Sequence, residues 1–335
     1  MPNEHGAGYY RWRVRPSERA ALSKLAWRRL DNEERVSFGE SLRAGFSDGS
    51  IEGADVLDAF VAFGSSNQSQ VAQYPMALLD FAARHMLDES QFGSFQNYAD
   101  RLYGRVYRKL GWKGKTSDEN DSFMRRNVVR FLALVSKDPK VRKQAVQLAN
   151  SFLGFETTKD KEAKFAPELR EVVLKVAVQE QGEAFFSFLE KEFVESQDAL
   201  YRQELLAALS VATNQKLAER ARNLALGQKL RANEKMIPLY MQMAMPELRD
   251  QAWDWVKKHY DELVAKLPEG RAGQLPLLMS GFCSTNKAEE IGQFFENRIH
   301  QLLGGPRNLA AAIESTRLCE AQVKRQGQSV RAFFD

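Results

Sequence analysis

Two runs of apolar residues at helical spacing, separated by one tight break, dominate the stretch from Phe123 to Gly154. The first run contains Val128, Val129, Leu132 and Val135, and the second contains Val141, Ala145, Leu148, Ala149 and Phe152. Residues at this spacing share one helix face, so the stretch predicts two antiparallel helices. Asp138 suits the N-cap of the second helix, Pro139 suits its first position, and Gly154 suits a left-handed end.

The same pattern returns 76 residues later, from Leu205 to Gly227. The equivalent positions are Val129, Phe131, Ala133, Asp138, Val141, Ala145, Leu148 and Ala149 in the first copy, and Leu205, Ala207, Leu209, Asn214, Leu217, Ala221, Leu224 and Ala225 in the second. That separation holds two helix pairs of about 40 residues each, the period of HEAT and armadillo arrays. A helix pair alone buries only part of its apolar surface, so stacked pairs must share a core. The sequence therefore predicts an all-α, HEAT/armadillo-like α-solenoid of antiparallel helix pairs.

Helical spacing begins at Pro16 and continues almost to the C-terminus, with short connections and a last helix from Pro306 to Gln326. We therefore assign residues 16–335 to one helical domain. The charged stretch within residues 155–166 is a possible joint between sub-arrays, although a solvated loop explains it equally well.

Residues 7–15 depart from the helical pattern, because Tyr10, Trp12 and Val14 alternate with three arginines. Alternation with period two predicts a β-strand with one buried face. A lone strand cannot satisfy its own backbone hydrogen bonds, so we expect it to belong to a sheet whose other strands lie outside this sequence. The alternative is an edge segment that folds against the first helices.

Composition excludes several classes of protein. Lys and Arg number 48 against 44 Asp and Glu, and this small surplus favours a solvated helical surface over a nucleic-acid-binding one. The basic cluster of Arg11, Arg13 and Arg15 is too short to change this. No segment reaches the roughly 18 consecutive apolar residues of a membrane-spanning helix, and the N-terminus lacks the apolar core of a signal peptide. We expect a soluble chain, and the compartment of any longer parent protein stays open.

The residues that most often carry metal or nucleophilic chemistry form no recognisable motif here. Cys283 and Cys319 are the only cysteines, and we expect two buried free thiols rather than a disulfide or a metal site. The four histidines, His5, His85, His259 and His300, include no pair at the H-E-x-x-H spacing of zinc hydrolases. Each is expected to be a surface or interhelical histidine.

Other catalytic patterns are also absent from the sequence, including the G-x-S-x-G nucleophile elbow and the phosphate-binding loop. The carboxylates Glu33, Glu34, Glu289 and Glu290 occur in charge runs that are typical of a solvated face. We therefore expect no catalytic residue, no cofactor and no metal in this chain. Arginines that suit carboxylate recognition are Arg125, Arg126, Arg130 and Arg170, but the alternative is that they face solvent or pair with neighbouring acids. The substrate-binding residues stay unassigned.

Several ordered segments resemble the zinc aminopeptidases of the aminopeptidase N and endoplasmic-reticulum aminopeptidase type. GAGYYRWRV is similar to the segment by which that family passes from a small β-sandwich into its C-terminal helical domain. The resemblance continues through ERVSFGESLRAGFSDGSI, LYGRVYRKLGW, SFMRRNVVRFLALVSKDPKVRKQA, VVLKVAVQEQGEAFFSFLEKEF, RQELLAALSVATNQKLAERARNLAL and LLGGPRNLAAAIESTRLCEA. It covers residues 7–335, and the order and spacing of the segments make it specific.

The resemblance implies that residues 1–15 end a preceding β-sandwich and that the helical domain caps a separate catalytic domain. In that family the catalytic domain carries the H-E-x-x-H zinc site, and the helical domain helps to enclose the peptide and regulates its access. This sequence has neither that motif nor G-x-M-E-N, so the chain alone should not cleave peptides, and the implied zinc belongs to the absent domain. The implied partners are that catalytic domain and a peptide substrate.

A second hypothesis rests on the repeat alone. Stacked helix pairs also form free-standing α-solenoid scaffolds that bind a protein or peptide partner. Whether the chain is a fragment or a whole protein therefore stays open, as do its peptide preference and oligomeric state.

Overall fold

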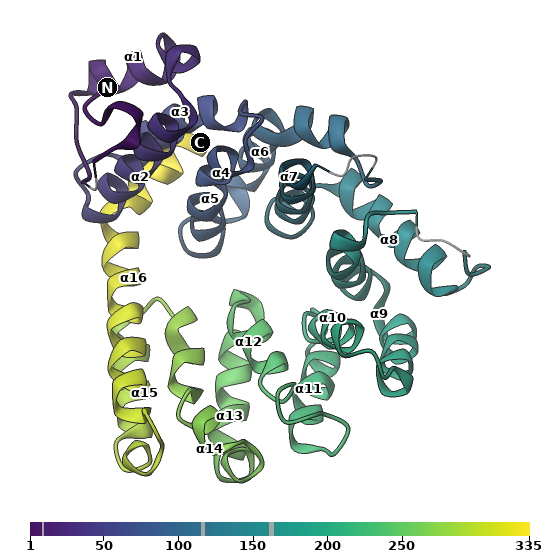
Figure 1. Cartoon of the computed structure of the whole chain (residues 1–335). Helices are drawn as coiled ribbons and strands as arrows, with labels where there is room; N and C mark the ends of the chain where they lie inside the picture. The colour runs from purple at the N-terminus through teal and green to yellow at the C-terminus, as the bar shows by residue number, and fades with distance from the viewer. Residues whose placement is uncertain (9, 115–117, 161–163) are drawn as a thin grey trace. The chain divides into compact units, whose positions relative to one another are not determined.

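The chain folds into an all-α array, shown in a computed structural model that describes residues 1–8, 10–114, 118–160 and 164–335 (Figure 1). No strand occurs in those residues. The α-helices are α1 (Pro16–Lys24), α2 (Asn32–Asp48), α3 (Gly53–Gly64), α4 (Ser69–Ala72), α5 (Tyr74–His85), α6 (Glu89–Leu110), α7 (Glu119–Arg130), α8 (Pro139–Leu153), α9 (Arg170–Glu195), α10 (Ala199–Leu209), α11 (Gln215–Asn223), α12 (Ile237–Met243), α13 (Pro246–Lys266), α14 (Glu269–Ala272), α15 (Thr285–Phe295) and α16 (Gly305–Phe334). The short 3-10 or π segments are η1 (Glu4–Gly6), η2 (Trp27–Arg29), η3 (Phe131–Val135), η4 (Pro167–Leu169), η5 (Leu224–Leu226), η6 (Leu275–Gly281) and η7 (Ile299–Gln301).

The contacts divide the chain into two compact units. Unit 1 contains Met1–Arg142, Lys164–Leu169 and Gln322–Asp335, and unit 2 contains Lys143–Ala163 and Arg170–Ala321. The chain thus passes from unit 1 to unit 2 within α8 and returns to unit 1 for Lys164–Leu169. It enters unit 2 again at Arg170 and passes back to unit 1 within α16.

Within each unit, the helices contact others that lie one to three places away along the chain. In unit 1, α3 contacts α1, α2, α5 and α6, and in unit 2, α10 contacts α9, α11 and α12. Contact between sequential and next-sequential helices is the packing of stacked helix pairs, in which each pair completes the core of the next. The predicted all-α, solenoid-like fold is confirmed.

The two copies of the sequence repeat carry equivalent helix starts. The Asp138 carboxylate accepts hydrogen bonds from the backbone N–H groups of Lys140 (2.8 Å) and Val141 (2.9 Å). In the second copy, the Asn214 side chain accepts from Lys216 (3.0 Å) and Leu217 (3.3 Å). Each side chain satisfies N–H groups that have no partner within the helix, as an N-cap should.

Most apolar positions of the repeat are buried in both copies, whereas Leu148 is half-buried. The buried residues are Val129, Phe131, Ala133, Val141, Ala145 and Ala149 in the first copy, and Leu205, Ala207, Leu209, Leu217, Ala221, Leu224 and Ala225 in the second. Gly154 follows α8 with a φ of 75°, which is the left-handed end that the sequence predicts. The helical spacing therefore identified the residues that form the core of each repeat.

The C-terminal part of α16 belongs to the core of unit 1. The final helix extends to Phe334, beyond the predicted end at Gln326. Phe334 lies 5.7 Å, between ring centroids, from both Phe95 and Tyr98 of α6, and Val330 is fully buried. α6 and the last helix of the chain therefore share one apolar core.

The predicted strand over residues 7–15 is not formed by the part of that segment that the structure describes, residues 7–8 and 10–15. Trp12 is buried, and its ring stacks on Phe38 of α2 with a centroid separation of 5.7 Å. Its indole N–H donates to the Ser37 hydroxyl (3.0 Å), and its backbone N–H donates to the Ser41 hydroxyl (3.3 Å). In the absence of a partner strand, side chains of α2 supply hydrogen-bond partners for the segment. The existence of a preceding β-sandwich stays a prediction.

The possible joint within residues 155–166 also stays a prediction, and its residues 161–163 lie outside the described part of the chain. None of the helices described here combines the length and the apolar character that crossing a bilayer requires.

Candidate functional site

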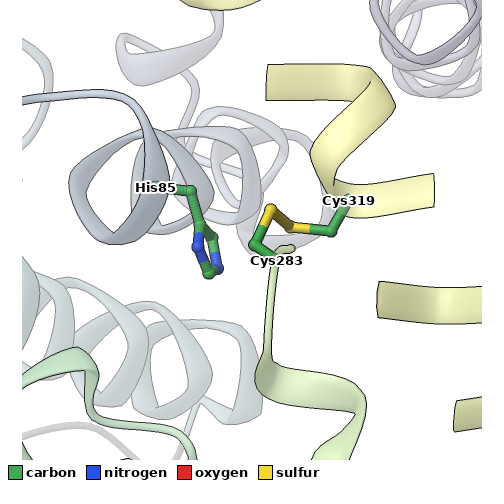
Figure 2. A group of neighbouring side chains, drawn as sticks. All are labelled: His85, Cys283 and Cys319. Carbon is green, nitrogen blue, oxygen red and sulfur yellow. A yellow bond between two sulfur atoms is a disulfide. The ribbon is translucent and has the colours of Figure 1, made fainter. Parts of the chain in front are cut away.

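The two cysteines form a disulfide, so the prediction of two buried free thiols is wrong. Cys283 precedes α15, Cys319 lies on α16, and their Cα atoms are 5.0 Å apart (Figure 2). Both side chains are half-buried. The cysteines are 36 residues apart in a helical background, so no local pattern reveals the pairing. Their sulfur atoms are not thiolates, the form that acts as nucleophile or metal ligand.

The four histidines lie on separate elements. His85 and His259 each contact an aromatic ring one turn earlier on their own helix, Phe81 and Trp255 respectively. His300 is exposed on η7. His5 hydrogen-bonds the Asp31 carboxylate at 2.5 Å, and this bond, with the negative charge of Asp31, raises the pKa of the imidazole. These positions agree with the expected surface or interhelical role.

Two of the four candidate arginines pair with acids. Arg125 is buried in unit 1 and donates to Glu168 at 2.6 Å. In unit 2, Arg170 pairs with Glu204 and lies over the ring of Tyr201, 4.9 Å from its centroid. Burial is the largest influence on Glu204 and raises the pKa of its carboxyl despite the nearby Arg170. Because both guanidinium groups are occupied, Arg125 and Arg170 support packing between segments rather than offering a free carboxylate site.

The other two candidate arginines remain available. Arg126 and Arg130 are exposed on α7, and among the described side chains neither has an ion-pair partner. Phe123 precedes them on the same helix with 48% of its surface exposed. Residues three and seven positions apart lie on one helix face, so these three side chains form a single stripe, which we call the α7 stripe.

Glu290, from the predicted charge runs, is held in a network of α13 and α15. Its carboxylate accepts from Lys257 (2.6 Å), Lys287 (3.1 Å) and the indole N–H of Trp253 (2.7 Å). Burial opposes its ionisation, but the hydrogen bonds from Lys257, Lys287 and Trp253 outweigh that effect and lower its pKa to about 2. A carboxylate that stays ionised among cations is a structural anchor rather than a proton donor at neutral pH.

Glu34 has a local role. The Asp31 side chain accepts from the backbone N–H of Glu34 (2.8 Å), and the Glu34 side chain accepts from the backbone N–H of Asp31 (3.0 Å). This reciprocal pair is a capping box that starts α2.

A basic cavity in unit 1 was missed at the level of sequence. Its volume is about 620 Å³, and four arginines contribute to its walls: Arg11, Arg13, Arg43 and Arg325. Two of them belong to the alternating N-terminal segment, whose three arginines are too few in the sequence to predict a basic patch. The contribution of α16 could not be found from spacing, because Arg325 lies more than 270 residues from α2 and reaches its Asp48 carbonyl oxygen at 3.4 Å.

The stacked helix pairs and their shared cores define the class of the protein, which is an all-α, solenoid-like domain. Within that class, residues 1–318 match the family described as the ERAP1-like C-terminal domain, and the chain belongs to that family.

Two curated relatives agree with this assignment. Over 229 residues, the chain is 29% identical to "Aminopeptidase 2, mitochondrial" of Saccharomyces cerevisiae (strain ATCC 204508 / S288c), a match that covers 66% of this chain and 23% of the relative. Over 288 residues, it is 21% identical to "Aminopeptidase N" of Lactococcus lactis subsp. cremoris, covering 84% of this chain and 33% of the relative. The chain therefore spans between about a quarter and a third of the length of these aminopeptidases.

Proposed function

We propose that this chain is the C-terminal, non-catalytic domain of a zinc aminopeptidase, and that it caps the catalytic domain and encloses the peptide during removal of N-terminal residues. The observation that carries the proposal is the family match over residues 1–318. Both relatives are named as aminopeptidases, and this chain aligns with only a minor part of each. We place the catalytic domain in the part of such an aminopeptidase that lies outside the region matched by this chain.

The side chains of this chain do not suit the zinc that the family implies. Its sequence lacks H-E-x-x-H, its histidines lie on separate elements, and its cysteines are joined in a disulfide. A catalytic zinc needs about three protein ligands converging on one point. We therefore assign the zinc to the catalytic domain and derive no reaction step from this chain.

For contact with the peptide we propose the α7 stripe. Arg126 and Arg130 are exposed and free of acidic partners among the described residues, and Phe123 adds an exposed ring. A guanidinium group binds a carboxylate through two parallel hydrogen bonds, whereas an aromatic ring contacts apolar side chains. Such a stripe suits the body or the C-terminal carboxylate of a peptide.

The proposal is tested by mixing the purified chain with the catalytic portion of a related aminopeptidase. We expect a complex, and we expect faster cleavage of longer peptides than of single-residue reporters when the chain is added. The double variant Arg126→Gln/Arg130→Gln should form the complex but lose most of the gain on longer peptides. Arg105→Gln on α6, also exposed and without an ion-pair partner among the described residues, is the matched control.

The absence of both a complex and a change in activity would contradict the capping role and favour the independent scaffold. A complex whose activity gain survives the double variant would retain the capping role and contradict the assignment of the α7 stripe.

A further inference from the structure

The basic cavity of unit 1 is built by three segments that are distant in the sequence. Arg11 and Arg13 come from the N-terminal segment, Arg43 and Asp48 come from α2, and Arg325 comes from the C-terminal part of α16. Its volume of about 620 Å³ falls within the range of roughly 300–1,000 Å³ that small-molecule sites occupy. The cavity therefore has enough room for a small ligand.

The positive charges of this cavity are only partly neutralised. Arg43 pairs with Glu40 at 2.9 Å. Asp48 accepts a hydrogen bond from the backbone N–H of Ser50 at 2.8 Å, and the hydrogen bonds from Ser50 lower the pKa of its carboxyl, so Asp48 offsets a second charge. Two of the four guanidinium charges remain in excess.

The side chains of two of the arginines make no polar contact with a described residue. Arg11 and Arg13 are exposed, and neither side chain makes an ion pair or a hydrogen bond with a described residue. Arg325 makes one long hydrogen bond, 3.4 Å, to the carbonyl oxygen of Asp48. The guanidinium groups thus retain most of their donors, which a ligand with several acceptor atoms would satisfy.

The end of α2 leaves room for the approach of Arg325. Gly49 follows α2 with a φ of 79°, and a Cβ atom at that position would lie 3.1 Å from Cδ of Arg325. Glycine adopts this left-handed conformation without the penalty that a side chain brings, and the absence of a side chain leaves room for Arg325 beside it. The turn at Gly49 and the contact of α2 with Arg325 therefore both contribute to the wall of the basic cavity.

We propose that this cavity binds a small anion that carries two or more phosphate groups. Phosphate oxygens point in several directions and match guanidinium groups that arrive from three chain segments, whereas a planar carboxylate presents two oxygens in one plane. The excess of positive charge also matches an oligophosphate better than a monovalent anion. Binding ties the N-terminal segment, α2 and the C-terminal part of α16 together within unit 1.

The test is calorimetric titration of the full chain with inorganic pyrophosphate, in low salt and again in chloride near physiological ionic strength. We expect saturable binding at one site per chain, weaker but still measurable in the higher salt. Binding should raise the unfolding temperature, because a ligand that binds only the folded state stabilises it. Citrate, titrated in the same way, tests carboxylate binding.

The variants assign the binding to the cavity. Arg13→Gln/Arg325→Gln should weaken pyrophosphate binding on the order of 100-fold, since each charge-assisted hydrogen bond contributes about tenfold or more. Arg11→Gln, which removes no described intramolecular contact and so should not disturb folding, should weaken binding about tenfold. Arg105→Gln, outside the cavity, should bind as the unchanged chain does.

Three results would overturn the proposal. One is no saturable binding of pyrophosphate to the folded chain. Another is an equal loss of affinity in Arg105→Gln and the cavity variants, which would indicate unspecific attraction. A third is citrate binding as tight as that of pyrophosphate, which would reject the assignment to phosphate.

Discussion

Arg202 of α10 holds both carboxylate oxygens of Glu234, each at 2.9 Å, in a buried, two-pronged ion pair. The same guanidinium donates to the carbonyl oxygens of Phe193 (2.8 Å), Ser196 (3.2 Å) and Lys229 (3.0 Å). Burial opposes the ionisation of Glu234, but the hydrogen bonds and charge of Arg202 outweigh it and lower the pKa of the carboxyl. The Arg202 side chain thus binds two segments of unit 2 to α10, the end of α9 with its connection to α10 and residues 229–234.

Removing one member of this pair should be costly. We expect Glu234→Gln to destabilise unit 2 by about 3–5 kcal/mol, because it leaves the Arg202 charge buried without a counter-charge. Urea unfolding followed by circular dichroism measures the change. Glu195→Gln, in the exposed pair with Lys191, should change stability by less than about 1 kcal/mol. Equal effects of the two variants would contradict the role given to burial.

Gln326 should be essential for seating the C-terminal segment in unit 1. Its amide donates to the carbonyl oxygens of Phe46 (2.8 Å) and Ile51 (3.0 Å), and its side-chain oxygen accepts from the backbone N–H of Gly53 (2.9 Å). Gln326→Leu leaves these buried groups unsatisfied and should cost about 3 kcal/mol or more.

Hydrogen exchange at the start of α3 measures this effect locally, because the Gly53 amide should exchange faster in the variant. The exposed neighbour Gln328 supplies the control, since Gln328→Leu should change stability by no more than about 0.5 kcal/mol. Unchanged protection of Gly53 in Gln326→Leu would refute this account of the contact.

Reduction of the Cys283–Cys319 disulfide should destabilise unit 2. The bond closes a loop of 36 residues, and loops of this size give a stabilisation of about 2–4 kcal/mol. Thermal unfolding with and without a dithiol reductant measures the loss. The double variant Cys283→Ser/Cys319→Ser should unfold at the lower temperature in both conditions. If the reductant lowered the unfolding temperature of that double variant as well, the loss of stability would not arise from the Cys283–Cys319 disulfide.

Acid should weaken the network around Glu290 within a defined pH window. The pKa of Glu290 is about 2 in the folded chain, against roughly 4.3 for an unperturbed glutamate. The contribution of Glu290 to the stability of the fold is therefore complete at a pH above its pKa in the unfolded chain. It is lost as the pH falls toward 2. Over that window, the stability of Glu290→Gln should fall less steeply than that of the unchanged chain. If the stability of Glu290→Gln and that of the unchanged chain fell equally with pH, the prediction would be contradicted.

Removal of either of the two equivalent N-cap side chains of the repeat should reduce stability by a similar amount. Asp138→Ala and Asn214→Ala each remove the side-chain acceptor for two backbone N–H groups, and each should cost about 1 kcal/mol. Asn297→Ala, at an exposed turn that has no capping bond among the described residues, should cost no more than about 0.5 kcal/mol. Denaturant midpoints of the three variants provide the comparison.

Local sequence determined the helices and the faces that they bury. Asp138, Asn214 and Gly154 act through backbone groups only a few residues away, so their roles could be read from the chain directly. The apolar spacing identified the core positions for the same reason, because a helix face depends only on separation along the chain. The family resemblance rests on the same ordered segments.

Tertiary structure alone decided which distant groups meet. The Cys283–Cys319 bond, the seating of Gln326 against Phe46 and the partners of Arg125 and Arg170 join residues separated by tens to hundreds of positions. Side-chain periodicity carries no information about such distances. The N-terminal segment illustrates the same limit, since period two predicted a strand, but a strand exists only where another backbone can pair with it. Here the hydroxyl groups of α2 hold Trp12 instead.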